Sequence, residues 1–253
     1  MVKIVIHGCN GRMGQFISKI AAADSEVEIV AGVDISDHIS NPYPVYSSIE
    51  KCEEQADVVI DFASAKAVDG LLAFCKEKKV PCVLCTTGLN EAQLQMVQET
   101  SREVALLKSA NMSLGINLLL KLLREAAPVL AAAGFDMEIV EKHHSQKLDA
   151  PSGTALALAD SINGALGNAY EYVYDRSDRR QTRPAKEIGI SAVRGGTIVG
   201  DHDVIFAGTD EVITLSHRAY SREVFAKGAV QAAKFLAGKP AGYYGMDDVI
   251  EGK

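Results

Sequence analysis

Along the first part of the chain, short apolar runs alternate with amphipathic segments whose apolar residues recur at helical spacing. The apolar runs predict strands at Val2–Ile6, Val27–Val33, Val58–Asp61, Cys82–Cys85 and Val104–Leu107. The segments between them predict helices near Arg12–Ala22, Lys66–Lys78 and Asn90–Ser101. Strands and helices that alternate in this way indicate an α/β fold with a parallel, doubly wound sheet.

After Asn111 the pattern changes. A long amphipathic helix, about Ile116–Ala132, leads into Asp136–Lys142, which alternates as a half-buried strand does. Further strands are predicted at Glu187–Arg194, Asp203–Phe206 and Val212–His217, and further helices after Pro151 and over about Arg222–Leu236. These segments predict a second domain of α+β type with a mostly antiparallel or mixed sheet. The polar, Arg-rich piece Asn168–Lys186 is predicted to be a mobile surface loop.

Composition and charge disfavour several classes of protein. The 253 residues carry a formal net charge of −7, which argues against nucleic acid as a partner because polyanion binding needs a broad basic surface. No stretch approaches the roughly 20 uncharged apolar residues of a membrane helix. The N-terminus begins in a strand pattern without the anatomy of a signal peptide. We therefore expect a cytoplasmic protein with no membrane partner.

The five cysteines do not resemble a disulfide framework, because their number is odd and they are scattered through the N-terminal half. Cys82 and Cys85 form a C-x-x-C motif within a predicted strand. Alternation puts these two side chains on opposite faces, which is the wrong geometry for a redox pair. We interpret them as small buried hydrophobic residues.

A glycine-rich loop directly follows the first predicted strand and opens a helix. Glycines at such a turn let the backbone approach a pyrophosphate, which then sits at the helix N-terminus. Asn10 occupies the second glycine position of the usual fingerprint, and we expect the turn to survive because Asn tolerates left-handed backbone geometry. Taken alone, the motif also fits a strand-to-helix turn with incidental glycines. The loop residues are Gly8, Cys9, Asn10, Gly11, Arg12, Met13 and Gly14.

The position of Asp34 favours a cofactor over a simple turn. It comes directly after the second predicted strand, where a Rossmann-type domain uses an acid to bind the ribose hydroxyls of adenosine. Two small polar loops follow later strands and are suited to line a nicotinamide. These loops are Thr86, Thr87 and Gly88, and Ser109, Ala110, Asn111 and Met112. The sequence therefore predicts a nicotinamide dinucleotide site in the first part of the chain.

The densest group of chemically active side chains follows the first strand of the second domain. It contains His143, His144 and Lys147 and enters a helix at Gly153 and Thr154. The free N–H groups and positive dipole at that helix start can hold a carboxylate. Lys147 would add a point charge to the same anion, and histidine is suited to move protons near neutral pH.

Plainer interpretations stay open for this segment. Ser152 or Thr154 can cap the helix in addition to any other role. His143 and His144 could ligate zinc, but no Cys, Asp or His stands at the usual companion spacing, so we predict no metal.

The same segment resembles the 4-hydroxy-tetrahydrodipicolinate reductases, also called dihydrodipicolinate reductases. The family signature E-x-H-H-x-x-K-x-D-A-P-S-G-T-A is present as Glu141–Ala155. The G-x-x-G-R-M-G loop at Gly8–Gly14, the T-T-G at Thr86–Gly88, the A-N at Ala110–Asn111 and the V-R-G-G at Val193–Gly196 also resemble the family. The likeness spans nearly the whole chain.

The resemblance implies a nicotinamide-dependent reductase on the route to lysine. Hydride would pass to C4 of an unsaturated cyclic dicarboxylate as its 4-hydroxyl leaves as water. His143 would be the acid/base and Lys147 the proton donor and carboxylate partner. His144, Gly153 and Thr154 would hold the substrate carboxylates. Both histidines can act only if the chain bends after His143, because adjacent strand residues face opposite ways.

The resemblance also implies the domain organisation. Residues 1–112 and 222–253 would form the dinucleotide-binding domain. Residues 113–221 would bind substrate and build a homotetramer through their sheet.

The choice between NADH and NADPH depends on Asp34. Its carboxylate can accept hydrogen bonds from both ribose hydroxyls of NADH but repels a 2′-phosphate. Ile35 and Ser36 supply no cation, and Arg12 is the only nearby cation that the sequence identifies. We therefore expect NADH to be used at least as well as NADPH.

Two other functions stay open. An oxidoreductase for a different keto or imino acid would need another catalytic set than His143 and Lys147. A non-catalytic nucleotide-binding sensor could keep Gly8–Gly14 but has no use for an acid/base and an anion clamp. Loss of nicotinamide absorbance with the dicarboxylate substrate separates the three.

Overall fold

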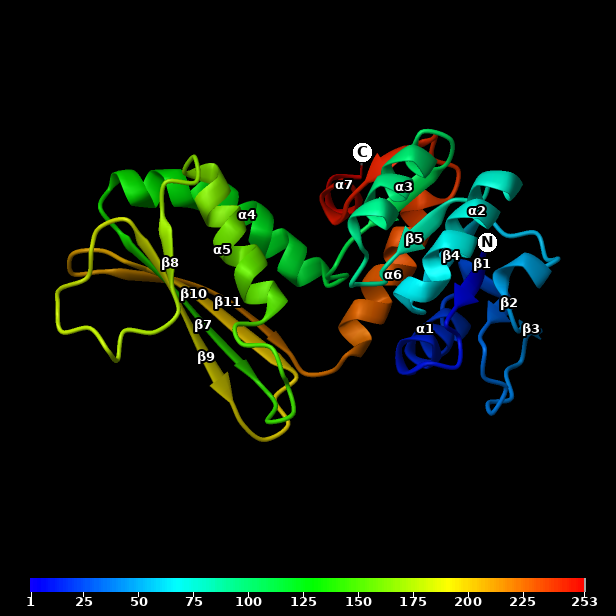
Figure 1. Ribbon diagram of the computed structural model, residues 1–253, viewed down its shortest axis with the longest axis horizontal. Helices are drawn as coiled ribbons and strands as arrows, with labels where there is room; N and C mark the ends of the chain where they lie inside the picture. The colour runs from blue at the N-terminus through cyan, green and yellow to red at the C-terminus, as the bar shows by residue number, and fades with distance from the viewer. Residues whose placement is uncertain (253) are drawn as a thin grey trace. The chain divides into compact units, whose positions relative to one another are not determined.

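The chain folds into two compact units, which the computed structural model describes over residues 1–252. The first unit consists of Met1–Leu114 together with the chain from Arg222 onward. The second unit is Gly115–Ser221. The C-terminal segment therefore returns to the unit in which the chain began (Figure 1).

The first unit is built on a seven-stranded sheet in the order β12-β6-β5-β4-β1-β2-β3. All neighbouring strands are parallel, which confirms the predicted doubly wound sheet. The order reverses between β1 and β4, and ligands of such sheets bind outside the carboxyl ends of the strands at that point. The strands are β1 (Val2–His7), β2 (Val27–Val33), β3 (Val45–Tyr46), β4 (Val58–Asp61), β5 (Cys82–Leu84), β6 (Ala105–Lys108) and β12 (Gly242–Tyr244).

Helices cover both faces of this sheet because its strands are apolar on both sides. Ile4 and Ile6 belong to the buried cluster of one face, and Val5 belongs to the cluster of the other. The first cluster includes residues of α1 (Arg12–Ala22), α6 (Glu223–Leu236) and α7 (Met246–Glu251). The second includes residues of α2 (Val68–Lys78) and α3 (Glu91–Ser101).

The cysteines follow the same alternation. Cys82 lies in the cluster of one face and Cys85 in that of the other, as the sequence predicted. All five cysteines are free and buried. Burial raises the pKa of the Cys85 thiol well above its usual value, with nearby Asp61 adding to the shift. Both residues of the C-x-x-C motif are therefore core residues.

The short elements β3, β12 and α7 of this unit were not predicted, nor was the 3-10 turn Ile49–Lys51. Two or three residues are too few to establish the alternation that identifies a strand. β3 and β12 are recognised by their pairing with β2 and β6 at the two edges of the sheet. The predicted strand ends at Cys85 and Val104 also shift by one residue each.

The second unit contains a five-stranded mixed sheet in the order β11-β10-β7-β9-β8. β10 is antiparallel to β7 and to β11, whereas β9 is parallel to β7 and to β8. This confirms the predicted mixed sheet. The strands are β7 (Asp136–His143), β8 (Glu171–Val173), β9 (Glu187–Arg194), β10 (Gly200–Ala207) and β11 (Val212–Ala219).

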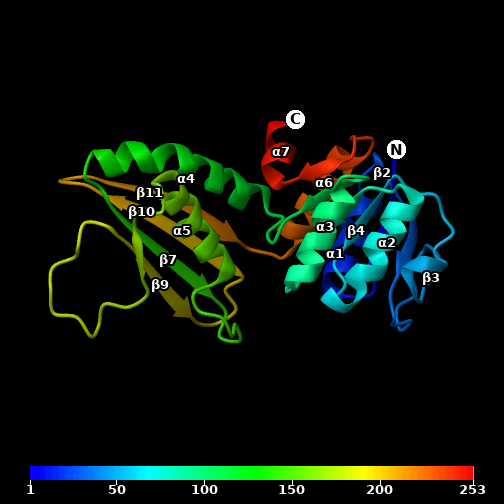
Figure 2. The ribbon, with the colours of Figure 1, turned by 45° about the horizontal axis from the view of Figure 1, so that its top comes forward.

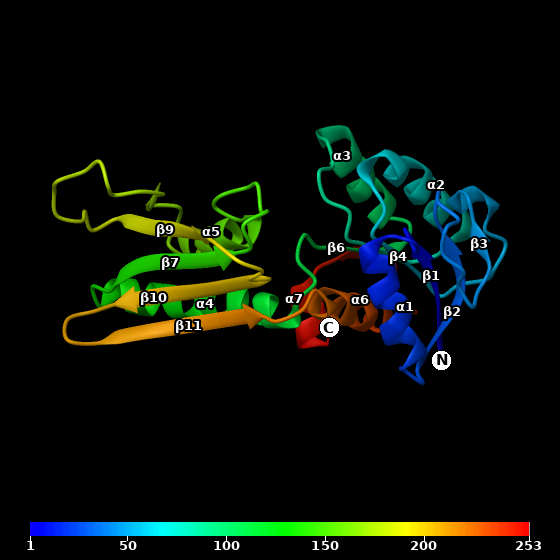
Figure 3. The same ribbon diagram turned by 90° about the horizontal axis from the view of Figure 1, so that it is seen from below.

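Two helices, α4 (Leu114–Ala132) and α5 (Gly153–Ala165), cover one face of this sheet (Figures 1 and 3). Alternate residues of β7, including Met137 and Ile139, pack into the cluster beneath them, together with Phe206. The same alternation carries Glu141 and His143 toward the helix-covered face. Figure 3 shows the opposite face without helices over it.

The segment Asn168–Lys186 contradicts part of its prediction. Most of the segment is an irregular surface loop, as expected (Figure 2), but Glu171–Val173 form strand β8, and arginine–carboxylate pairs tie the segment to the sheet. Arg176 pairs with Glu138 at 2.7 Å, and Arg183 pairs with the same carboxylate at 2.9 Å. The arginines suggested a segment exposed to solvent, but they pair with the carboxylates of Glu138 on β7 and Glu187 on β9.

Candidate active site

The glycine loop joins β1 to α1 in a turn that leaves no room for side chains at two positions. Gly8 has φ +86, and a Cβ there would lie 2.8 Å from the carbonyl oxygen of Phe62. A Cβ at Gly14 would lie 2.2 Å from the carbonyl oxygen of Gly8. The loop therefore needs glycine at both positions, and its backbone opens toward the N-terminus of α1 as a pyrophosphate site requires.

Asn10 keeps the turn for a different reason from the one predicted. Its backbone is not in the left-handed region, so its tolerance of that region has no part in the loop. Instead its buried side-chain amide donates to the carbonyl of Ser36 and accepts from the amide of Asn41 at 2.7 Å. Asn10 thus ties the glycine loop to the segment that follows β2.

Asp34 follows β2 and stands against the glycine loop. One of its carboxylate oxygens accepts a hydrogen bond from the backbone N–H of Asn10 at 2.9 Å, and the other accepts from that of Ser36 at 2.9 Å. These two bonds fix the carboxylate beside the loop, where a ribose of a dinucleotide would lie.

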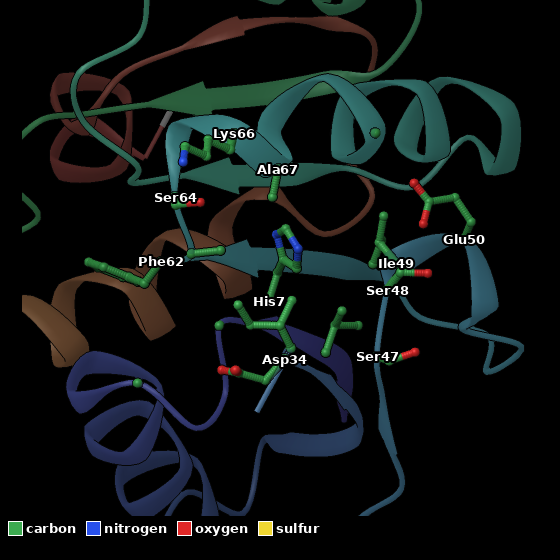
Figure 4. Close-up of a pocket in the computed structure, with 16 residues that line it drawn as sticks. His7, Asp34, Ser47, Ser48, Ile49, Glu50, Phe62, Ser64, Lys66 and Ala67 are labelled. Carbon is green, nitrogen blue, oxygen red and sulfur yellow. The ribbon is translucent and has the colours of Figure 1, made fainter. Parts of the chain in front are cut away.

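A cavity of about 460 Å³ opens beside Asp34, and we call it the Asp34 cavity (Figure 4). Its lining is mixed, with the apolar side chains Val33, Ile35 and Ile49 and the cation Lys66. Of the predicted cofactor residues, Gly8, Gly11 and Asp34 line it. The full lining is His7, Gly8, Gly11, Val33, Asp34, Ile35, Ser47, Ser48, Ile49, Glu50, Phe62, Ala63, Ser64, Lys66, Ala67 and Gly70.

His7, which lines this cavity, belongs to a buried histidine–carboxylate pair. His7 ends β1 and Asp61 ends β4, and the two are register partners where the strand order reverses. Nδ1 of His7 lies 2.7 Å from a carboxylate oxygen of fully buried Asp61. Neither residue was predicted from the sequence to belong to the site, although both stand at the carboxyl ends of predicted strands.

The other predicted cofactor residues lie outside the Asp34 cavity. Thr86, Thr87 and Gly88 come after β5, and Ser109–Met112 come after β6, at the same edge of the sheet as the glycine loop. The hydroxyl of Thr86 is buried without a hydrogen-bond partner among residues 1–252.

Three other residues of the predicted cofactor set differ in exposure. The side chains of Cys9 and Met112 belong to the core, so only their backbone atoms can face a ligand. Arg12 is exposed at the start of α1.

The second candidate site begins where β7 ends. His143 is its last residue, and a turn follows in which the N–H of Lys147 donates to the carbonyl of His144. The chain leaves the strand between the two histidines, which is the bend that the resemblance implied. Nδ1 of His143 lies 2.6 Å from a carboxylate oxygen of Glu141, two residues earlier on the same face.

Glu141 is fully buried and is held by three partners. Arg194 on β9 donates to both of its oxygens, at 2.7 and 2.8 Å, and the N–H of Ser152 donates at 2.9 Å. Burial opposes ionisation of Glu141, but the bonds from Arg194, His143 and Ser152 outweigh it and lower the pKa of the carboxyl. The ionised carboxylate fixes the orientation of the His143 ring and puts a proton on Nδ1.

Arg194 extends this network to the segment that carries Lys147. Its guanidinium also donates to the backbone carbonyl of Asp149 at 2.6 Å. The carboxylate of Asp149 in turn pairs with Nζ of Lys147 at 2.8 Å. The bond from Lys147 and one from the N–H of Gly153 lower the pKa of that carboxyl. His143, Lys147 and Gly153 therefore belong to one connected group, which we call the Glu141 network.

The start of α5 has the geometry of an anion site. Ser152 is its N-cap, with its hydroxyl accepting from the N–H of Ala155 at 3.2 Å, which confirms the capping role. A Cβ added at Gly153 would meet no atom of residues 1–252 within 4 Å. The surroundings of the Gly153 Cα are therefore open, and the N–H of Gly153 already bonds a carboxylate, that of Asp149.

His202 on β10 completes the buried surroundings of His143. The two rings are 5.1 Å apart and nearly perpendicular, and Nε2 of His202 lies 3.2 Å from the Ser152 hydroxyl. Burial lowers the pKa of His202 to about 4, with His143 adding to the shift. A neutral His202 beside His143 leaves proton transfer to His143.

Glu141, Asp149 and Arg194 were not assigned a role from the sequence. Glu141 and Asp149 stand within the quoted signature, and a carboxylate two residues before a strand histidine was a usable signal. Arg194 is the β9 register partner of His143, and only the parallel pairing of β7 with β9 reveals that. In the first unit, Lys66 was missed as a cation near Asp34.

Residues 1–252 contain no group of three or more His, Cys, Asp or Glu side chains arranged to hold a metal ion. No helix among them combines the length and apolar character needed to cross a membrane.

Both halves of the chain match one protein family. Residues 2–112 match the family described as dihydrodipicolinate reductase, N-terminus, and residues 115–250 match dihydrodipicolinate reductase, C-terminus. The chain is similar to 4-hydroxy-tetrahydrodipicolinate reductases of Caldanaerobacter subterraneus and Clostridium tetani. The first is 54% identical over 251 residues, covering 99% of both chains. The second is 49% identical over 250 residues, covering 99% of this chain and 97% of the relative.

A solved structure agrees with these matches. The dipicolinate-bound dihydrodipicolinate reductase of Paenisporosarcina sp. TG-14 has a TM-score of 0.79 to this chain at 26% sequence identity. The similarity covers 97% of each chain, so it includes both units.

Proposed function

The chain belongs to the dihydrodipicolinate reductase family, and from that premise we propose how its residues carry out the reaction of that family. The reaction is the nicotinamide-dependent reduction of 4-hydroxy-tetrahydrodipicolinate to tetrahydrodipicolinate, with loss of water, in lysine and diaminopimelate biosynthesis. The observation that carries the assignment of residues is the Glu141 network, which joins a histidine, a lysine and a helix N-terminus in one connected group.

The first unit fits a nicotinamide dinucleotide. Gly8 and Gly14 leave the backbone bare where a pyrophosphate needs close approach, and Asp34 offers carboxylate oxygens for ribose hydroxyls. Thr86–Gly88 and Ser109–Met112 line the nicotinamide end in this proposal. When bound, the cofactor supplies a hydride to C4 of the substrate ring.

His143 is proposed to hold and move the proton of the reaction. Its Nδ1 is occupied by Glu141, which leaves Nε2 as the atom that exchanges a proton with substrate. The Glu141 carboxylate stabilises the ring when it becomes positively charged, and Arg194 keeps that carboxylate ionised and in place. The bond from Nδ1 to Glu141 thus fixes the orientation of the His143 ring, and Nε2 exchanges the proton with the substrate.

Lys147 and the start of α5 are proposed to bind the same substrate carboxylate. The N–H groups of Gly153 and Thr154 and the ammonium of Lys147 present donors to one anion. His144 is proposed to contact the second carboxylate. The carboxylate of Asp149 now occupies the position between Lys147 and Gly153. An incoming substrate carboxylate would displace it and take over both contacts.

Cofactor preference is a finer proposal. We propose that NADH is used at least as well as NADPH, because the Asp34 carboxylate repels a 2′-phosphate. Lys66 lines the same cavity and offers the phosphate a counter-charge that the sequence analysis had not identified. The preference is therefore expected to be modest.

We also propose a homotetramer and a cytoplasmic enzyme, as the resemblance implies. The supporting observation is the sheet face of the second unit that no helix covers (Figure 3). It carries the half-buried apolar side chains Val140 and Ile205 in the middle strands. A mass in solution of four chains by light scattering supports this proposal, and a monomeric mass contradicts it.

The test of the proposed function is an assay with purified protein and freshly generated 4-hydroxy-tetrahydrodipicolinate. Loss of nicotinamide absorbance that requires both protein and substrate is expected. An enzyme for another keto or imino acid would oxidise the cofactor only with that substrate. A sensor would bind the cofactor without oxidising it under any of these conditions.

A further inference from the structure

The His7–Asp61 pair is the buried titratable group that the proposed mechanism does not use. It lies at the carboxyl ends of β1 and β4, where the order of the sheet reverses. His7 is 5% exposed and lines the Asp34 cavity, and Figure 4 shows its ring between Ala67 and Asp34. The ring therefore faces the interior of the cavity.

Asp61 determines which nitrogen of His7 is available. Its carboxylate oxygen lies 2.7 Å from Nδ1 and accepts the proton carried there. A second bond, from the N–H of Ala63 at 3.3 Å, holds the same oxygen. Nε2 is left with its lone pair and has no partner among residues 1–252. Nε2 is open to the cavity, so a ligand that covers it must bring a donor or leave an acceptor buried without one, which is destabilising.

The surroundings of His7 suit a flat, largely apolar group. Val33, Ile49 and Phe62 line the cavity around it, and Ile35 also lines it although 97% exposed. Asp34, in the same cavity, is the proposed partner of the adenosine ribose hydroxyls. The part of a dinucleotide that adjoins that ribose on the side away from the pyrophosphate is the purine base.

We propose that His7 recognises the adenine base of the cofactor, with Nε2 accepting a hydrogen bond from the exocyclic 6-amino group. This inference rests on the proposed binding of a nicotinamide dinucleotide in the first unit. The 6-amino group is the only N–H donor on the adenine ring of a nucleotide, and it meets the only polar atom of His7 that lacks a partner in the described residues. Asp61 is a positioning residue in this arrangement, because it acts through His7.

The probe is reduced nicotinamide hypoxanthine dinucleotide, in which a carbonyl replaces the 6-amino group. A carbonyl oxygen opposite the lone pair of Nε2 leaves two acceptors facing each other. Wild-type enzyme is expected to prefer NADH over this analogue by about tenfold in kcat/KM, the effect of a buried acceptor losing its donor. His7→Ala is expected to bring the ratio close to one, mainly through weaker use of NADH.

Two further variants separate adenine recognition from a general effect on the cavity. Glu50→Gln changes an exposed carboxylate that lines the same cavity, and it is expected to keep the wild-type ratio. Asp61→Asn allows His7 to carry its proton on Nε2, and it is expected to lower or invert the ratio because the carbonyl analogue then meets a donor. A ratio that falls in Glu50→Gln but not in His7→Ala overturns the assignment.

The outcomes also separate this proposal from the proposed function. Turnover with both cofactors at equal kcat/KM in the wild type contradicts adenine recognition by His7 and leaves the reductase assignment standing. Equal losses with both cofactors in His7→Ala indicate a ribose contact instead. If neither cofactor is oxidised, the proposed function fails. Calorimetric affinities of wild-type protein for ADP-ribose and its inosine counterpart then decide the base contact alone, with equal affinities overturning it.

Discussion

The Asp34 cavity and the Glu141 network are built from different kinds of groups. In the cavity, bare backbone at Gly8 and Gly14 and one fixed carboxylate define the site. In the network, fully buried Glu141 and its partner Arg194 hold the reactive side chains. A site defined by shape should respond to substitution through binding. A site defined by buried charge should respond through turnover and through folding stability.

His143 gives the largest expected difference between the two regions. His143→Gln removes the proposed acid/base and should lower kcat by about 10²–10⁴-fold. The Kd for NADH should stay near the wild-type value, because the cofactor residues belong to the first unit. Steady-state kinetics and NADH fluorescence titration measure the two quantities. Near-wild-type turnover would show that another group moves the proton.

Arg194 tests the buried charge of the network. Arg194→Met leaves Glu141 buried without its bidentate partner, which should destabilise the protein by about 3 kcal/mol. The double variant Glu141→Gln/Arg194→Met removes both charges and should recover much of that stability. Its turnover should stay low, because His143 has then lost the carboxylate that orients it. Thermal unfolding and kcat of the three proteins provide the comparison.

If the double variant were as active as the wild type, the pair would be structural only. That result would remove Glu141 and Arg194 from the proposed mechanism while leaving their contribution to folding.

His202 gives the network a pH dependence of stability. Its pKa is lowered from 6.5 to about 4 by burial, so the folded state keeps it neutral while the unfolded state takes up a proton. Stability should therefore fall as the pH drops from 6.5 toward 4, by about 3 kcal/mol for this group. The difference in melting temperature between wild type and His202→Gln should change across that window. A constant difference would contradict the neutral, buried state of His202.

Lys147 tests the anion site at the start of α5. Lys147→Ala should raise the substrate KM and lower kcat, since a charge-assisted bond contributes about 1.5–3 kcal/mol. Lys147→Arg should rescue it only in part, because a planar fork differs from a compact ammonium. Asp149→Asn is the matched control, because it removes the internal carboxylate that Lys147 now holds and should not raise KM. An unchanged KM in Lys147→Ala would indicate a structural role.

Lys66 gives the smallest expected effect and belongs to the Asp34 cavity. Lys66→Ala removes a cation near Asp34, so it should lower kcat/KM for NADPH relative to NADH by several-fold, about 1 kcal/mol or less. Kinetics with both cofactors at one ionic strength measure the shift. In the wild type, a tenfold preference for NADPH, about 1.4 kcal/mol, would mean that Lys66 or Arg12 overcomes Asp34.

The sequence predicted regular elements better than it predicted the partners of charged residues. The first and last residues of strands such as β2 and β9 were predicted correctly, because apolar residues and turn signals mark where each strand begins and ends. Alternation also correctly assigned Cys82 and Cys85 to opposite faces. In contrast, the Arg-rich segment Asn168–Lys186 was expected to be a mobile loop without fixed partners. Its acidic partners come from β7 and β9, and the sequence alone did not show that these strands lie beside it.

The same limit explains what was missed at the candidate sites. Arg194 lies 53 residues from Glu141, and Asp61 lies 54 residues from His7. Each pair forms only because two strands are neighbours in a sheet, which spacing along the chain does not reveal. At Asn10 the predicted turn is present, but the reason given for it was wrong. The turn does not use a left-handed backbone at Asn10, and the side chain instead bonds the carbonyl of Ser36. His143, Lys147 and Gly153 were identified because they are close in sequence within the quoted signature, whereas Glu141 and Asp149 of the same signature were missed.

The most direct test of the account follows the hydride itself. NADH carrying deuterium at the transferring position of the nicotinamide is oxidised by the wild-type enzyme with 4-hydroxy-tetrahydrodipicolinate, and the product is analysed by mass spectrometry and NMR. Tetrahydrodipicolinate with deuterium at ring C4 is the expected product. Product without the label, or cofactor oxidised without this product, would contradict the proposed hydride transfer.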